Sequence, residues 1–119
     1  MEIRENGEAL LLRLLQATGQ RGRVIAQNTA NTNTPGYSRQ VVQFEELLGR
    51  ALREGDRDAL SEIQPQVVTD TVTPAKPDGN NVNAELERQA GQENNVLGQV
   101  WMTLLEAHYS SLHTAITGR

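Results

Sequence analysis

Apolar and small residues recur every three or four positions in the first 30 residues, as on one face of a helix. This 3.5-residue repeat is typical of a helix that pairs with another helix along a narrow seam. We therefore expect a helix from Glu8 to about Asn28, with Gly19 and Gly22 marking either a kink or the close approach of a second backbone. The series is Leu11, Leu15, Thr18, Gly22, Ile25 and Thr29.

The C-terminal third contains no proline after Asn83 and predicts one long helix to about Thr117, with Asn83 as its N-cap. Two adjoining apolar rows follow this helix, which indicates two contact surfaces. One surface should meet the N-terminal helix and the other something else, and the outer row defined below is expected to contact either a neighbouring subunit or the partner helix. The first row, the predicted seam, is Leu86, Ala90, Glu93, Leu97, Val100, Leu104 and Ala107. The second row, the predicted outer row, is Trp101, Leu105, His108, Leu112 and Ala115 or Ile116.

The middle of the chain predicts shorter elements. The first helix must end before Pro35, because proline disfavours the α conformation of the residue before it, and Pro35-Gly36 fits a type II turn. A weak strand over 39–44 should lead into a short helix that ends by Gly55. The polar, proline-containing remainder to Asn81 is expected to be a flexible arm or a surface excursion, with one possible short strand over 66–72.

Together these patterns predict a mainly α fold. The long N- and C-terminal helices should pair as an antiparallel coiled-coil-like bundle, with a short middle helix and an irregular arm that includes a possible short β segment. We divide the chain into residues 1–36 (helix and turn), 37–81 (middle region) and 82–119 (C-terminal helix).

Composition narrows the function. The chain has 119 residues, a formal net charge of −4 and four aromatic side chains, so its core must be built from small aliphatic residues. Such a core buries little surface per residue, which favours self-association. The chain has no cysteine, no apolar window long enough for a membrane span and no basic signal-peptide segment. Its acidic balance disfavours nucleic-acid binding.

No pattern of catalytic or metal-ligating residues is found. His108 and His113 lie about 140° apart around a helix, so they cannot share a metal ion. The neighbouring serines have no Asp to orient a base, and nucleotide-binding glycine loops are absent. The sequence therefore predicts no enzyme activity, no cofactor, no metal and no small-molecule substrate. The acidic residues Asp56, Asp58 and Glu62 lack the spacing of a calcium loop.

The most unusual segment is the asparagine-rich stretch before the Pro-Gly turn. Asn28, Asn31 and Asn33 all lower helix propensity, so their concentration needs a reason. Their amides could bond local carbonyl groups, or they could bond across an interface between stacked subunits. Both interpretations remain open at this point.

This segment resembles the N-terminal signature SN-x-AN-x-NTPGY of bacterial flagellar axial proteins, the rod, hook and hook-associated subunits. Thr29 stands where Ile, Leu or Val is usual, and Gln27 replaces a small residue. Residues 78–83, DGNNVN, are similar to the lead into the C-terminal helix of proximal-rod B subunits. Residues 50–77 carry no such signal. The matching positions of the signature are Asn28, Ala30, Asn31, Asn33, Thr34, Pro35, Gly36 and Tyr37.

The resemblance implies a non-enzymatic subunit of the flagellar basal-body rod, stacked helically around the export channel and linking the MS ring and export gate to the distal rod. The implied partners are copies of itself, other rod subunits, an MS-ring/rod adaptor protein and the type III export gate. The implied location is the periplasmic space, reached without a cleaved signal peptide. Assembly contacts are expected at Leu86, Leu97, Val100, Trp101, Leu104, Leu105 and Leu112.

Alternatives to this interpretation remain. Phe44 and Leu48 resemble the F-x-x-x-apolar motif read by the export gate, but they also fit the buried face of a short helix. A proximal-rod C subunit would share the N-terminal signature. A soluble coiled-coil adaptor would explain the seams but not the Asn and Pro-Gly cluster, and a small hydrolase would need a catalytic pocket that the sequence does not indicate.

Overall fold

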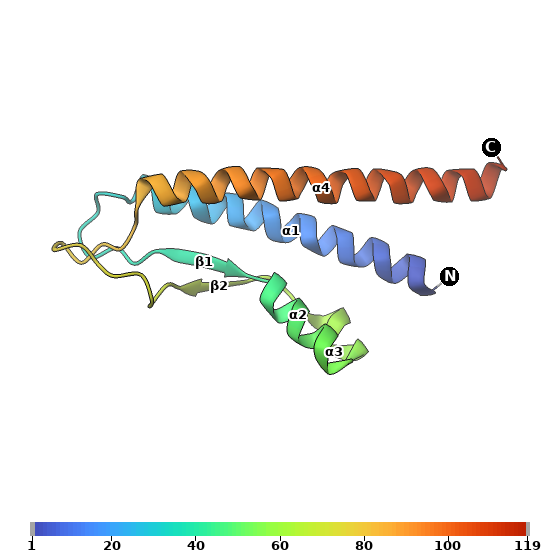
Figure 1. Cartoon of the computed structure of the whole chain (residues 1–119), viewed down its shortest axis with the longest axis horizontal. Coiled ribbons are helices and arrows are strands. Elements are labelled where there is room, and N and C mark those ends of the chain that lie inside the picture. The colour runs from blue at the N-terminus through green and yellow to red at the C-terminus, as the bar shows by residue number, and fades with distance from the viewer. Residues whose placement is uncertain (1, 119) are drawn as a thin grey trace.

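Two long antiparallel helices form the frame of the molecule, which measures 63 × 30 × 15 Å (Figure 1). The computed structural model of the chain describes residues 2–118. The mainly α fold with paired terminal helices is confirmed. Within the described chain, no helix combines the length and apolar character that a membrane crossing requires. The elements are α1 (Glu2–Ala30), β1 (Gln40–Gln43), α2 (Glu45–Glu54), α3 (Arg57–Glu62), β2 (Gln66–Thr69) and α4 (Ala84–Thr117).

The predicted seam of α1 faces α4. A Cβ atom placed on Gly22 would lie 3.6 Å from Nδ2 of Asn94, and one placed on Gly91 would lie 3.8 Å from Cγ2 of Ile25. The glycines therefore mark the close approach of two backbones, and α1 continues as one helix through them. It also begins at Glu2, earlier than the repeat predicted.

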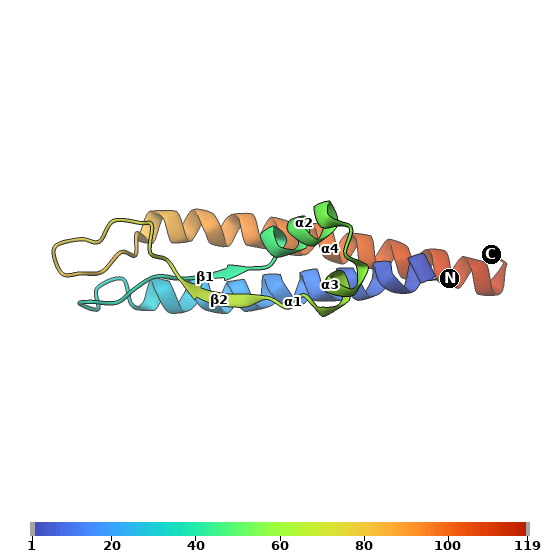
Figure 2. The same cartoon turned by 90° about the horizontal axis from the view of Figure 1, so that it is seen from below.

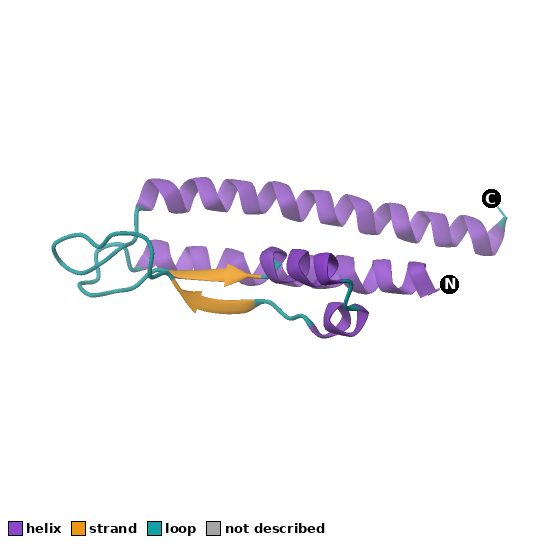
Figure 3. Cartoon of the chain, turned by 60° about the horizontal axis from the view of Figure 1, so that its bottom comes forward, coloured by secondary structure: helices purple, strands orange, loops and turns teal. Residues whose placement is uncertain are grey.

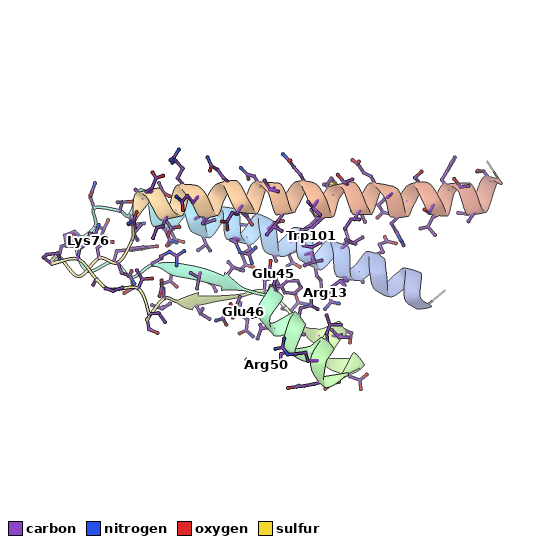
Figure 4. The ribbon with its side chains drawn as sticks, in the orientation of Figure 1. Arg13, Glu45, Glu46, Arg50, Lys76 and Trp101 are labelled. Carbon is purple, nitrogen blue, oxygen red and sulfur yellow. The ribbon has the colours of Figure 1, made fainter. Side chains whose placement is uncertain are left out.

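On α4 the expected outer row contacts the partner helix, one of the two partners expected for it, whereas the choice of the first row as the seam is wrong. The second row faces α1 as far as Leu112: Leu105 is 7% exposed, and Trp101 packs against the core (Figure 4), whereas Ala115 and Ile116 beyond it are exposed. Adjacent positions on a helix point about 100° apart, so two rows that are one residue apart face different neighbours. Because both rows are apolar, hydrophobicity alone does not tell which of them faces α1. The first row is largely exposed, with values of 52% for Leu86, 36% for Leu97, 44% for Val100 and 47% for Leu104.

The middle region covers a second face of α1, as the turned views show (Figures 2 and 3). Its β1 and β2 strands pair antiparallel, with Gln40 opposite Thr69 and Gln43 opposite Gln66. The predicted strands are therefore present, although β2 is shorter than expected. Non-local pairing places residues 66–69 against β1, so this part of the expected arm is held to the body of the molecule.

The main hydrophobic cluster lies where α2 meets α1. It consists of Leu14, Ala17, Phe44 and Leu48, all buried. The short middle helix ends at Gly55, as predicted. The sequence analysis missed α3, which begins where the Asp56 carboxylate accepts a 3.0 Å hydrogen bond from the Ala59 N–H. Such capping stabilises a helix too short to show an apolar repeat.

Candidate assembly site

The asparagine-rich segment forms a compact turn at the end of α1. Gly36 has a φ of 74°, the positive value expected for the Pro-Gly turn. Asn31 donates from its Nδ2 to the carbonyl oxygen of Gln27 at 2.8 Å, so this amide caps its own helix. Asn33 is exposed, and its side chain makes no hydrogen bond to the part of the chain that the structure describes. Different asparagines in the signature therefore have different roles.

Asn28 joins three parts of the molecule while only 1% exposed. Its Nδ2 donates to the Gln40 carbonyl at 2.8 Å, and its Oδ1 accepts from the Gln40 N–H at 3.0 Å and from the Tyr37 hydroxyl at 3.1 Å. Nδ2 also lies 3.3 Å from Oε2 of Glu87 on α4. The Asn28 amide thus forms hydrogen bonds with both main-chain groups of Gln40 at the outer edge of β1, as a neighbouring strand would.

Asn80 performs a similar function for the turn and is fully buried. Its Nδ2 donates to the carbonyl oxygens of Asn31 and Thr34, each at 2.8 Å. Its Oδ1 accepts from the Val82 N–H at 2.7 Å. One side chain thus fixes the turn after α1 to the lead into α4.

Two glycines meet where these segments cross. The Gly36 N–H donates to the Asp78 carbonyl at 2.8 Å. A Cβ atom on Gly79, where φ is 85°, would lie 3.3 Å from Cα of Gly36. The two sequence motifs that carried the resemblance, 28–37 and 78–83, are therefore packed against each other.

A buried ionic cluster lies beneath this turn. Arg39 contacts the carboxylates of Glu87 and Asp70, at 3.0 Å for Asp70, and Glu87 is fully buried. Hydrogen bonds from Thr73, together with the Arg39 guanidinium, hold the pKa of Asp70 well below its usual range. Burial raises the pKa of Tyr37, and the nearby charge of Glu87 adds to this effect. The sequence analysis missed this cluster, because no spacing pattern connects three residues so far apart in the chain.

The first row of α4 is an apolar surface that the described chain leaves largely uncovered. Most of the exposed large apolar side chains lie on α4. From Ala90 to Thr117 the helix carries only Glu93 and Glu106 as Asp, Glu, Lys or Arg residues. A helix that is apolar on several faces is expected to be covered by partners. Of the expected contact residues, Leu86, Leu97, Val100 and Leu104 lie on this surface, and Trp101, Leu105 and Leu112 face α1.

An open groove of about 450 Å³ continues this surface towards the free ends of the two helices. It lies where α1 and α4 separate (Figure 1). Its lining includes two residues of the first row, so the groove and the row form one continuous apolar surface. The lining residues are Leu11, Leu104, Ala107, His108, Ser111 and Leu112.

Phe44 and Leu48 lie in the hydrophobic cluster, where they are 0% and 9% exposed. Their side chains pack against Leu14 and Ala17 of α1. In the folded chain they are therefore inaccessible to a partner.

Comparison with known proteins adds a second kind of evidence. No family model matches the sequence. The flagellar basal body rod protein FlgB of Borrelia hermsii is 28% identical over 134 aligned residues, which cover 98% of this chain and 99% of the relative. FlgB of Borreliella burgdorferi is 29% identical over 115 residues, which cover 82% of this chain and 84% of the relative. The chain is similar to both FlgB proteins along most of its length.

This result confirms the resemblance to flagellar rod proteins that the two motifs indicated. The names of both relatives describe rod proteins. In this FlgB-like chain the described residues contain no group of His, Cys, Asp and Glu side chains arranged to hold a metal ion.

Proposed function

We propose that this FlgB-like chain is a non-enzymatic structural subunit of the bacterial flagellar basal-body rod. It polymerises helically around the export channel and links the MS ring and export gate to the distal rod. The observation that carries the proposal is the similarity to two rod proteins along nearly the whole chain. The largely uncovered first row of α4 supports it, because a subunit that completes its core by stacking needs such a surface.

The signature residues divide into two groups in this proposal. The buried Asn28 and the partly buried Asn31 and Tyr37 fix the conformation of the turn. The exposed members contact neighbouring subunits at the end of the molecule. These exposed members are Ala30, Asn33, Thr34, Pro35 and Gly36.

The proposed partners are copies of the chain, other rod subunits, the MS-ring/rod adaptor protein and the type III export gate. The rod passes through the periplasmic space, and the chain reaches it without a cleaved signal peptide. If the gate reads Phe44 and Leu48, it must read them before folding, because both side chains are buried in the folded chain.

Isolated basal bodies provide the test. In a strain of the source bacterium that lacks this gene, we expect rods and motility to be lost, and a tagged copy should restore both and label the rod. Normal rods in the deletion strain would refute the proposed function. A tagged copy found with another envelope complex would favour the coiled-coil adaptor instead.

Leu104→Asp tests the first row directly. Leu104 is 47% exposed, so the charge is tolerated in the monomer but placed in the proposed contact. We expect the variant to be exported while rods fail to form. Gln99→Asp, also exposed on α4, is the matched control. Leu105→Asp is unsuitable, because Leu105 is buried against α1 and the variant would unfold the helix pair.

A further inference from the structure

α1 carries a third row that meets neither α4 nor the middle region. Every residue in it is exposed, and the spacing of three and four residues is that of a helical seam. It lies about 160° around α1 from the row, including Arg21 and Asn28, that contacts β1. We call it the free row of α1: Ala9, Leu12, Gln16, Gly19, Arg23, Ala26 and Ala30.

The free row of α1 and the first row of α4 lie on opposite sides of the helix pair. Ala90 of the first row lines a small pocket together with Val41 and Val42, so the first row is on the side of the middle region. The free row is on the far side. One molecule therefore presents two different helical seams on opposite sides. A second copy can bind one of these seams while the other seam of the same molecule stays free.

The two rows are complementary when they are set in the register that already joins α1 and α4 within one chain. In that register Gly22 lies opposite Asn94, and Ile25 lies opposite Gly91. Between two copies, the same register places Arg23 opposite Glu93.

Further along the same alignment, Gly19 lies opposite Leu97, and Leu12 lies opposite Leu104. A large side chain thus meets a glycine at one position and another leucine one heptad further, with Gln16 opposite Val100 between them. Matched sizes of this kind allow two helices to pack closely.

Arg23 and Glu93 are the single charged residues of their rows, and their charges are opposite. Both are exposed, and neither forms an ion pair with the residues that the structure describes. Their charges are therefore available to a second molecule.

Sliding the copies by one heptad removes the charge match in either direction. One shift places Glu93 opposite Gln16 and Arg23 opposite Leu86. The other places Glu93 opposite Ala30 and Arg23 opposite Val100. Each shift buries two unpaired charges against neutral residues, which is costly. Only the unshifted register pairs them.

We propose that a second copy of this chain docks the free row of its α1 on the first row of α4, antiparallel and without axial shift. The inference rests on the proposed rod function and specifies its self-contact. The two docking surfaces differ, so each added copy leaves a fresh surface for the next, and the contact is heterologous and open-ended.

Cysteine cross-linking tests this geometry, because the chain has no cysteine of its own. Purified Leu12→Cys and Leu104→Cys variants, mixed and mildly oxidised, should form a mixed disulfide dimer. Neither variant alone should cross-link. A mixture of Leu12→Cys and Leu97→Cys, displaced by one heptad, is the register control and should not cross-link.

Charge reversal tests the proposed ion pair. Either Arg23→Glu or Glu93→Arg should lower the mixed-dimer yield about tenfold, and combining Arg23→Glu in one copy with Glu93→Arg in the other should restore it. Arg53→Glu, on the exposed face of α2, should have no effect. Circular dichroism of each variant verifies that it is folded.

The outcomes separate this inference from the proposed function. Dimers of Leu12→Cys alone would show a symmetric contact and overturn the inference. Absence of the mixed dimer, with the tagged chain still in the rod, would also overturn it while leaving the rod function intact. A mixed dimer from a chain that is absent from basal bodies would support the self-contact and refute the rod function.

Discussion

Two buried asparagines replace main-chain hydrogen bonds where irregular segments meet. The Asn28 amide forms hydrogen bonds with the main-chain N–H and carbonyl groups of Gln40 at the edge of β1. The Asn80 amide donates hydrogen bonds to two carbonyl groups of the turn. The interpretation that the signature asparagines bond local main-chain groups therefore holds for Asn28 and Asn31. The side chain of Asn33 is free of such bonds within the described part of the chain and remains available for a contact between subunits.

Asn80→Ala should lower the free energy of unfolding by about 1–3 kcal/mol, because it leaves the Val82 N–H without its partner and removes one of the two hydrogen bonds that the carbonyl groups of Asn31 and Thr34 each accept. Urea unfolding measures the change. Asn33→Ala removes an exposed amide from the same turn and should stay within about 0.5 kcal/mol of the parent. Equal effects of the two substitutions would contradict the role given to Asn80.

Asp70 should make folding sensitive to acid. Its pKa is lowered in the folded chain, chiefly by hydrogen bonds from Thr73. Its stabilising contribution is therefore present above the unfolded pKa of about 4, and is lost as pH falls through the lower folded pKa.

Asp70→Asn removes this contribution. When the pH is lowered from about 6 to about 2.5, the free energy of unfolding of the Asp70→Asn variant should decrease less than that of the parent chain. Urea titration at each pH measures this free energy. Asp58→Asn, at an exposed position on α3, should keep the parent slope. An unchanged slope in Asp70→Asn would show that other groups control the acid response.

Among the elements, the helix pair depends on small residues at its contact. A Cβ atom on Gly98 would lie 3.8 Å from Oγ1 of Thr18, an ordinary van der Waals distance. Gly98→Ala should therefore raise the free energy of unfolding by about 0.5–1 kcal/mol, since alanine favours the helix without a clash. Gly98→Leu should lower it, because its larger side chain exceeds the space. Thermal unfolding compares the two, and a destabilised Gly98→Ala would mean that the helices pack more closely here.

The sequence predicted the long helices well because their signals are local. The repeat located α1, and Asn83 caps α4 by accepting from the N–H groups of Glu85 and Leu86, as expected. The pairing of β1 with β2 depends on residues far apart in the chain, so the sequence suggested the strands but not their contact.

The N-terminal half of the α4 face that meets α1 could not be predicted from hydrophobicity. It contains the polar residues Glu87 and Asn94, whose burial depends on distant partners such as Arg39 and Thr18. The exposed first row has the more regular apolar pattern, which made it the apparent seam. The α4 face that meets α1 thus combines polar residues in its first half with the apolar side chains of Trp101 and Leu105 in its second half, while the more regular apolar row stays largely exposed.

At the scale of the whole molecule, packing is uneven along the 63 Å length. The middle region and its hydrophobic cluster support the central part of the helix pair. Towards the free ends an open groove lies between the helices, which are joined there by the contacts of Glu8 with Tyr109 (2.9 Å) and His108 (3.7 Å), and the side chains of residues 113–118 are exposed. Local stability should follow this difference, because opening requires less energy where fewer apolar groups are buried.

Amide hydrogen exchange of the dilute monomer tests this expectation. Residues 18–28 of α1 and 87–98 of α4 should exchange slowly, because the two helices are in close contact there and Asn28 and Asn94 join them to neighbouring elements. Residues 7–12 and 106–117 should exchange faster and become protected when copies associate, because the proposed self-contact would cover the groove. The Arg23→Glu variant, in which the proposed self-contact is weakened, should keep the monomer pattern at every concentration. Uniform strong protection throughout α1 in the dilute monomer would instead mean that the helix pair is fully stable before any partner binds.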